Sequence, residues 1–190
     1  MTGVQTCALP IYSIFIQHGK LSFALTTSTT IHNNSVQKIQ PQVYWLRSDR
    51  NKLTLIAKSL PSNRFGSTPQ QVLTIAVQKL LSAKPSDDLS STIPKGTKLL
   101  SLQVRADGVH VDLSPEFRSG GGSTSMIYRV AQVIYTASSL DPNAKVFISV
   151  GGQSIDQNHP LGGEGLILQQ PTTRDSPEER LRQRFAADFL

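Results

Sequence analysis

The chain has 190 residues, 38% of them hydrophobic and 17% charged, with a formal net charge of +6 at pH 7. This length is typical of one domain with tails, and the apolar fraction is sufficient to bury a core. Cys7 is the only cysteine, which excludes an internal disulfide and a zinc site built from several cysteines.

The N-terminal residues differ in composition from the rest of the chain. Residues 2–11, TGVQTCALPI, match the translation of a common sequencing-library adapter, so we interpret residues 1–11 as an assembly artefact. Setting them aside removes Cys7 and with it any thiol nucleophile. They have neither the basic start nor the apolar run of a secretory signal, and any such signal or anchor would lie upstream of Tyr12, so these residues do not indicate the compartment.

Basic charge gathers in the N-terminal third. Residues 12–42 are rich in Ser, Thr, Asn and Gln and are interpreted as a linker or an unreliable segment. Residues 12–64 carry seven Lys or Arg against Asp49 alone, whereas the rest of the chain is balanced in charge. This imbalance leaves a basic nucleic-acid-binding domain open as an alternative function. A few exposed lysines beside a strand are the simpler interpretation, so no nucleic acid partner is expected.

The domain itself is expected over residues 43–170. It starts with a hairpin of two β-rich runs and a polar turn, at residues 43–46, 53–60 and 48–52. Thr68 and Gln71 then have the spacing of a capping box, with Pro69 at the first helical position. An apolar stripe follows and predicts a half-buried helix over residues 67–83.

The second half of the domain repeats this order. Apolar residues alternate on both arms of a second hairpin, at Leu100, Leu102 and Val104 and at Val109, Val111 and Leu113. Asp107 and Gly108 are a favoured pair for a tight primed turn, because both tolerate positive φ. Helical spacing predicts a second helix over residues 123–140, and a last alternating strand ends at Gly151 and Gly152.

The element order β-β-α-β-β-α-β determines the expected fold class. Each helix needs a sheet face on which to bury its apolar stripe, and one small sheet satisfies both. We therefore expect an α+β fold, a two-layer α/β sandwich with two helices packed on one face of a small, mostly antiparallel sheet. Residues 171–190 are expected to form a C-terminal tail that docks on the domain or on a partner through Leu181, Phe185 and Phe189.

Four motifs carry a resemblance to a known family. They are the strand end VHVDLSPEF, the glycine run before the second helix, the helix end YTASSLDP and the final strand with its small turn. In this order and spacing the segment from about Val43 to Gln170 resembles a GerMN domain of sporulation and spore-germination proteins. The turn and family-motif residues are Asp107, Gly108, Asp112, Ser114, Glu116, Phe117, Gly121, Gly122, Gly151 and Gly152.

The resemblance implies a fold akin to the ring-building motifs of secretion and sporulation machinery, which agrees with the predicted element order. It also implies a non-catalytic module, lipoprotein or membrane anchored at the cell envelope, that acts through protein–protein assembly. The expected partners are envelope proteins or a second copy of the chain, contacted through exposed parts of the sheet or the second helix. A membrane is expected only through an upstream anchor, and no cofactor is expected.

A second alternative is a cell-wall-directed hydrolase or a ligand-binding domain that uses Asp112 and Glu116. Acid–base catalysis needs two carboxyl groups that converge across a substrate. Asp112 more simply orders a turn by accepting backbone N–H groups. A deep cleft that holds both carboxyl groups would favour the hydrolase, whereas an Asp112 engaged in turn hydrogen bonds would exclude it.

Other polar residues give weaker patterns. The glycine run precedes a helix, but the lysine of a phosphate loop is absent, so we expect a flexible connection capped by Ser123 or Thr124. His110 is expected to face solvent, and none of the four histidines has metal-ligand spacing, so no metal is expected. One of Tyr44 and Trp45 is expected in the core and the other on the surface.

Overall fold

The computed structural model describes residues 40–50, 52–61, 68–82, 86, 88–163 and 165–175. Contacts divide the chain into two units, Met1–Gln37 and Lys38–Leu190, and every described residue belongs to the second. Several predictions concern residues outside this description, namely the adapter interpretation, the linker up to residue 39, His18, His32, Leu181, Phe185 and Phe189.

The elements follow the predicted order, with a short 3-10 helix and a two-residue strand in addition. In chain order they are β1 (Gln42–Asp49), β2 (Lys52–Ser59), α1 (Pro69–Ser82), β3 (Leu99–Arg105), β4 (Gly108–Leu113), η2 (Pro115–Arg118), α2 (Ser123–Ala137), β5 (Val146–Val150) and β6 (Gln153–Ser154).

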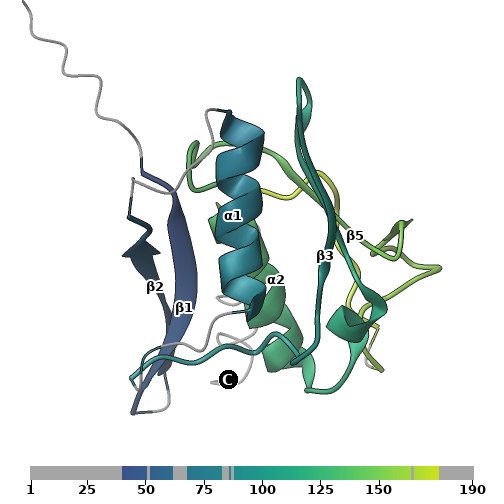
Figure 1. The fold of residues 1–190 in the computed structure, drawn as a ribbon. Helices are drawn as coiled ribbons and strands as arrows, with labels where there is room; N and C mark the ends of the chain where they lie inside the picture. Colours follow the sequence, from purple (N-terminus) through teal and green to yellow (C-terminus); the bar gives the residue numbers. More distant parts are fainter. Residues whose placement is uncertain are drawn as a thin grey trace, which may run out of the picture. The chain divides into compact units, whose positions relative to one another are not determined.

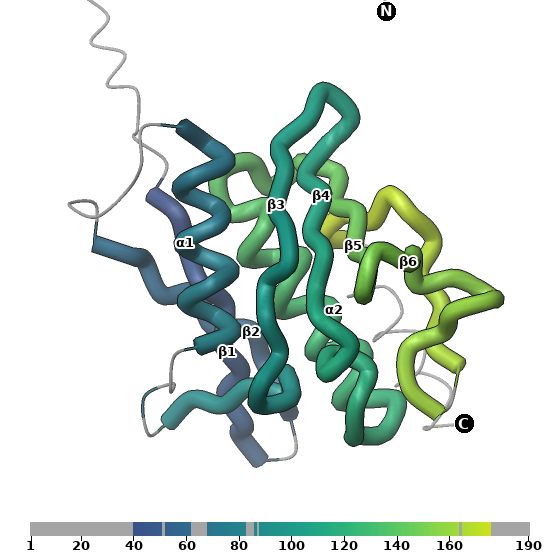
Figure 2. Tube along the Cα trace, turned by 45° about the vertical axis from the view of Figure 1, so that its right-hand side comes forward, coloured from purple at the N-terminus to yellow at the C-terminus, as the bar shows by residue number. Residues whose placement is uncertain are grey.

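The strands form two sheets, and both α-helices lie between them (Figure 1). β1 and β2 pair antiparallel as a separate hairpin, while the larger sheet has the order β3-β4-β5-β6 (Figure 2). In that sheet β4 and β5 pair in parallel, because α2 connects them as a crossover. The structure confirms an α+β fold with mostly antiparallel strands. The observed fold differs from the expected one in one respect. The β1–β2 hairpin packs on the side of the helices opposite the larger sheet instead of joining that sheet (Figure 1).

The burial of α2 explains why the β1–β2 hairpin covers the helices on the side opposite the larger sheet. Every residue from Met126 to Ile134 is buried, so the helix has no solvent face over this stretch. A helix that is apolar around most of its circumference must be enclosed on all sides. α2 therefore presents no surface to a partner here. No helix among the described residues is long and apolar enough to span a bilayer.

The enclosure also buries β1 on both of its faces. Trp45 belongs to the main core, and Tyr44 packs edge-on against Tyr135 with the ring centroids 5.2 Å apart. The prediction that either Tyr44 or Trp45 would be exposed was wrong, because a strand between two packed surfaces has no free face.

The domain continues beyond Gln170. Thr172 exchanges two backbone hydrogen bonds with Val146, at 2.8 and 2.9 Å. The guanidinium of Arg174 lies over the rings of Tyr44 and Tyr135 and donates to the carbonyl oxygen of Ser138 at 2.9 Å. The first residues of the expected tail are thus part of the folded unit.

The start of α1 follows its sequence signal. The N–H of Thr68 donates to Oε1 of Gln71, and the N–H of Gln71 donates to Oγ1 of Thr68, both at 3.3 Å. Pro69 is the first helical residue. The capping box is confirmed, and caps of this kind contribute about 1 kcal/mol.

The tight primed turn lies elsewhere than predicted. Arg105 pairs with Gly108, so the turn residues between β3 and β4 are Ala106 and Asp107, and neither has positive φ. A two-glycine turn instead joins β5 to β6, where Gly151 and Gly152 have φ of 61° and 78°. The Asp-Gly signal failed because Gly108 serves a different purpose. At φ 145° it brings the chain against the carbonyl oxygen of Lys145, where a side chain has no room.

A β-bulge changes which residues of β3 face the helices. Leu99 pairs with Leu113, and the next pair is Ser101 with Asp112, so Leu100 is the extra residue. Leu100 is 52% exposed, although it alternates in the sequence with Leu102, which is buried. The bulge shifts the alternation by one residue and turns Leu99 inward in its place.

Candidate functional site

Asp112 is engaged in the turn between β5 and β6. Its Oδ1 accepts hydrogen bonds from Oγ of Ser149 at 2.7 Å and from the N–H of Gly152 at 2.9 Å. Asp112 therefore orders a turn, although the turn is the one after β5 and not the proline-started turn that follows it in sequence. Gly151 and Gly152 give that turn the positive φ values it requires.

Glu116 lies on the exposed side of η2. The Ser114 hydroxyl, together with backbone hydrogen bonding, holds the pKa of this carboxyl below its usual value. Ser114 itself is buried and ties η2 to the start of β3, because Lys98 N–H donates to its Oγ at 2.8 Å. Glu116 does not line the depression on the outer sheet face to which Asp112 contributes. The two carboxyl groups thus do not form the converging pair that a hydrolase needs.

A buried arginine of α2, for which the sequence predicts no role, binds the backbone of the glycine run before that helix. Arg129 is 2% exposed, and its guanidinium donates to carbonyl oxygens of Phe117 at 2.6 Å, Gly120 at 2.9 Å and Thr92 at 3.0 Å. Burial lowers the pKa of this guanidinium from its usual value. The only signal available was a charged residue among the apolar residues of α2.

The same loop lacks the cap that was expected. Gly122 is the N-cap residue of α2 and no side chain caps the helix, so the prediction that Ser123 or Thr124 would do so was wrong. At Gly121, φ is 85° and an added Cβ would contact the side chain of Ser125. Phe117 lies in the 3-10 helix before this loop and is fully buried. The guanidinium carbon of Arg129 lies 5.7 Å from the centroid of the Phe117 ring.

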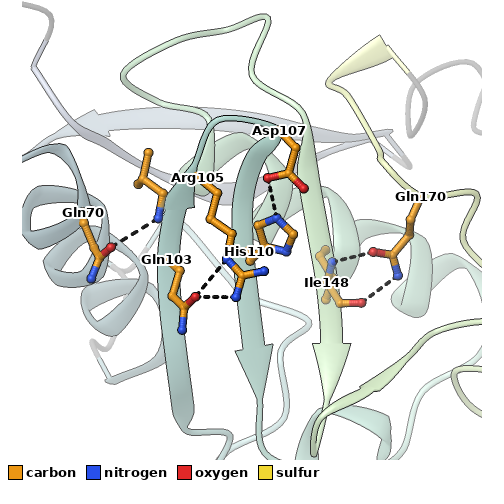
Figure 3. Close-up of polar contacts among 8 residues, drawn as sticks. Gln70, Gln103, Arg105, Asp107, His110, Ile148 and Gln170 are labelled. Atoms are coloured by element: carbon orange, nitrogen blue, oxygen red, sulfur yellow. Dashed lines mark hydrogen bonds and ion pairs between the residues drawn. The ribbon is translucent and has the colours of Figure 1, made fainter.

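Polar side chains gather on the outer face of the larger sheet (Figure 3). The His110 ring stacks on Phe147 with centroids 4.3 Å apart, and its Nε2 lies 2.9 Å from Oδ1 of Asp107. This contact holds the pKa of Asp107 below its usual value. Arg105 donates to Oε1 of Gln103 on the neighbouring part of the face. His110 does point away from the core, but Phe147 covers one side of its ring.

Two of the free strand edges are closed by contacts within the domain. The edge of β1 pairs with Ser90 and with side chains of α2, since Tyr44 N–H donates to Oγ1 of Thr136 at 3.1 Å and Nε2 of Gln132 donates to Tyr44 O at 3.0 Å. The edge of β5 is closed by β6, by Thr172 and by Gln170. The Gln170 amide accepts from Ile148 N–H at 2.9 Å and donates to Ile148 O at 2.7 Å (Figure 3).

The edge of β3 is open by comparison. Within the described residues, the hydrogen bond that reaches this edge is that of Val104 N–H with Oε1 of Gln70, at 3.3 Å and exposed to solvent (Figure 3), and α1 packs beside the strand. Beside the start of this strand, the C-terminal half of α1, Ser86, residues 89–91 and residues 93–99 line a groove. Its walls carry Leu81, Ile93 and Leu99, which are partly buried, with two lysines at the rim. These features make the β3 edge the strongest candidate for a binding surface.

The described residues contain no group of three or more His, Cys, Asp or Glu side chains that could hold a metal ion. His159 lies beside Asp156 alone, with 3.4 Å between Nδ1 and Oδ1. The features that the described residues do offer are hydrogen-bonding strand edges and apolar surface.

Comparisons with known proteins agree with this fold. A family model described as Germane, sporulation and spore germination, matches residues 42–156. The chain is similar to the structure of the first GerMN domain of the sporulation protein GerM from Bacillus subtilis, with TM-score 0.55 and 17% identity over 72% of this chain and 98% of that one. It is also similar to the tandem GerMN domains of GerM, with TM-score 0.53 and 19% identity over 72% of this chain and 46% of that one. No curated protein matches its sequence.

Proposed function

Because the chain belongs to the Germane family of sporulation and spore germination, we propose that it is a non-catalytic module of the cell envelope that acts by protein–protein assembly. The observation that carries this proposal is the contrast between its polar residues and its surface. Asp112 and Arg129 form hydrogen bonds within the domain, whereas the edge of β3 and the adjoining groove have room for a partner.

The carboxyl groups support a non-catalytic role. A general acid at neutral pH needs a raised pKa, whereas the pKa of Glu116 is lowered. Asp112 has both a hydroxyl and a backbone N–H as partners on one oxygen. A substrate would have to displace these contacts and break the turn before β6.

The proposal is tested in the source organism with the natural reading frame, tagged at its C-terminus. Cell fractionation during growth and during sporulation, followed by chemical cross-linking, measures its location and its assembly state. We expect the protein in the envelope fraction, cross-linked to a defined envelope protein. A cytosolic protein that remains monomeric at both stages would overturn the proposal.

Envelope location and assembly need separate controls. A variant lacking the natural sequence upstream of Tyr12 should lose the envelope fraction if that sequence carries the export signal or anchor. The Asp112→Asn, Glu116→Gln double variant should assemble normally, because neither carboxyl is proposed to react. Loss of cell-wall hydrolysis in that variant would instead favour the hydrolase.

A further inference from the structure

We propose that the open edge of β3 is a strand-addition site for an extended segment of a partner protein, with alternating apolar side chains and acidic ends. This inference rests on the proposed assembly function and deepens it by naming the contact. It follows from three properties of the described residues, which are the state of the strand edges, the exposed apolar side chains and the charge around the groove.

The strand edges differ in what satisfies them. An uncovered edge presents a row of N–H and C=O groups that can pair with another chain. The domain closes β1 with Gln132 and Thr136 and closes β5 with β6, Gln170 and Thr172. On β3, Leu102 directs its backbone groups to the same side as Val104, two residues away, and no described residue pairs with them there.

Exposed apolar side chains distinguish β3 from β2 and from the two-residue β6, which are also edge strands. The large hydrophobic side chains exposed among the described residues are Leu100 at 52%, Val104 at 40% and Ile167 at 37%. Two of them lie on β3 and none on β2. The exposed ends of β2 instead carry Lys52 and Lys58, and edge lysines of this kind discourage pairing.

The bulge at Leu100 leaves enough regular strand for pairing. It interrupts the register between Leu99 and Ser101, and from Ser101 to Arg105 the pairing with β4 is regular. The bulge also turns the Leu100 side chain to the outer face of the sheet, whereas Leu99 turns inward and helps to line the groove. A strand added along Leu102 and Val104 would therefore place the side chains of one face against Val104 and the groove, and those of its other face beside Leu100.

Charge selects the kind of segment. Lys95 and Lys98 line the groove, and none of the described residues that line it is acidic. The whole chain carries a net charge of +6, so a second copy is electrostatically disfavoured as the occupant. An acidic residue at the end of the segment that lies beside Leu99 complements the two lysines, and one at the other end lies towards Arg105, while the backbone of the segment supplies the hydrogen bonds and its alternate side chains the apolar contact.

The experiment uses the full chain and a set of synthetic peptides. The probes are EVTVTVTE, its basic counterpart KVTVTVTK, and EVTVTVTE with alternate amides methylated so that it cannot form a ladder. Fluorescence anisotropy measures affinity, and hydrogen–deuterium exchange locates the bound strand. We expect EVTVTVTE to bind at least about tenfold more tightly than KVTVTVTK at low salt, to slow exchange in residues 99–105, and to lose binding when methylated.

Two charge-reversed variants make the test specific. Lys95→Glu with Lys98→Glu should invert the preference between the acidic and the basic peptide. Lys52→Glu with Lys58→Glu changes the net charge equally on β2 and should leave the preference unchanged. The inference is overturned if the methylated peptide binds as well as its parent, if protection appears on β2, or if the chain alone dimerises through β3.

The outcome separates this inference from the proposed function. The Lys95→Glu, Lys98→Glu variant is also expressed in the source organism and cross-linked as above. An envelope complex that forms normally in this variant overturns the strand-addition site and leaves the assembly function standing. Absence of any complex in the unmodified protein overturns the assembly function itself.

Discussion

Arg129 holds the entry to α2 through Phe117. Its Nη1 donates to the Phe117 carbonyl oxygen at 2.6 Å, while its guanidinium carbon lies 5.7 Å from the centroid of the Phe117 ring. The same side chain reaches Gly120 and Thr92, so one buried cation connects η2, the glycine run and the loop before β3. Its three carbonyl partners would be left without a donor in its absence.

Replacement of Arg129 by methionine should therefore destabilise the domain. Methionine fills much of the volume but donates no hydrogen bond, so we expect a loss of about 3 kcal/mol in the free energy of unfolding. Urea denaturation followed by circular dichroism measures this loss. Lys145→Met, at an exposed position, removes the same sign of charge and should change stability little. Equal stability of the two variants would contradict the anchoring role.

Gly108 tests the close approach of β4 to the start of β5. A Cβ at this position would collide with the backbone carbonyl of Lys145, which accepts a hydrogen bond from Val109 N–H at 2.8 Å. We expect Gly108→Ala to cost about 3 kcal/mol, since strain at a positive φ adds to the collision. Gly96 has φ 88° with open space around it, so Gly96→Ala should cost only about 1 kcal/mol. Thermal unfolding of both variants measures the difference.

Local chemistry explains which parts of this fold the sequence predicts. The capping box of Thr68 and Gln71 depends on residues three apart, and the glycine turn at Gly151 depends on neighbours, so both are readable from the chain. The division into two sheets depends instead on the contact of β1 with α2, which joins Tyr44 to Thr136 across 92 positions. No short-range pattern encodes that contact.

The features of the candidate site also fall into those that short-range sequence patterns predict and those that depend on tertiary contacts. The turn-forming preference of Asp112 was readable because aspartate accepts backbone N–H groups readily, although the identity of the turn required the tertiary structure. Arg129 was missed because its partners are backbone carbonyls, which carry no sequence signature. The open edge of β3 was missed for a related reason. Whether an edge is covered depends on side chains such as Gln170, which lies 22 positions from its partner Ile148.

Gln170 closes the β5 edge with an amide that both donates and accepts. Gln170→Glu keeps an acceptor for Ile148 N–H but faces Ile148 O with a carboxylate, so we expect a loss of about 2 kcal/mol at pH 7. Protonation restores a donor, and the folded state then favours the neutral form of this glutamate. Relative to the unmodified protein at the same pH, the variant should therefore recover stability as pH falls from 7 to 4. Gln170→Met loses both bonds and should show a pH-independent deficit, and urea denaturation at both pH values compares the two.

His110 and Asp107 give a pH dependence of opposite sign. The hydrogen bond from His110 lowers the pKa of Asp107 in the folded state. Its contribution to stability is present above the unfolded aspartate pKa of about 3.9 and is lost as pH falls through the lower folded value. We expect His110→Phe, which keeps an aromatic ring against Phe147, to raise the Asp107 titration midpoint in a carboxyl-detected NMR experiment. Asp156 is the internal control, because its lowered pKa arises chiefly from the backbone N–H groups of His159 and Asn158 and should not move. An unchanged Asp107 midpoint would show that another group sets its pKa.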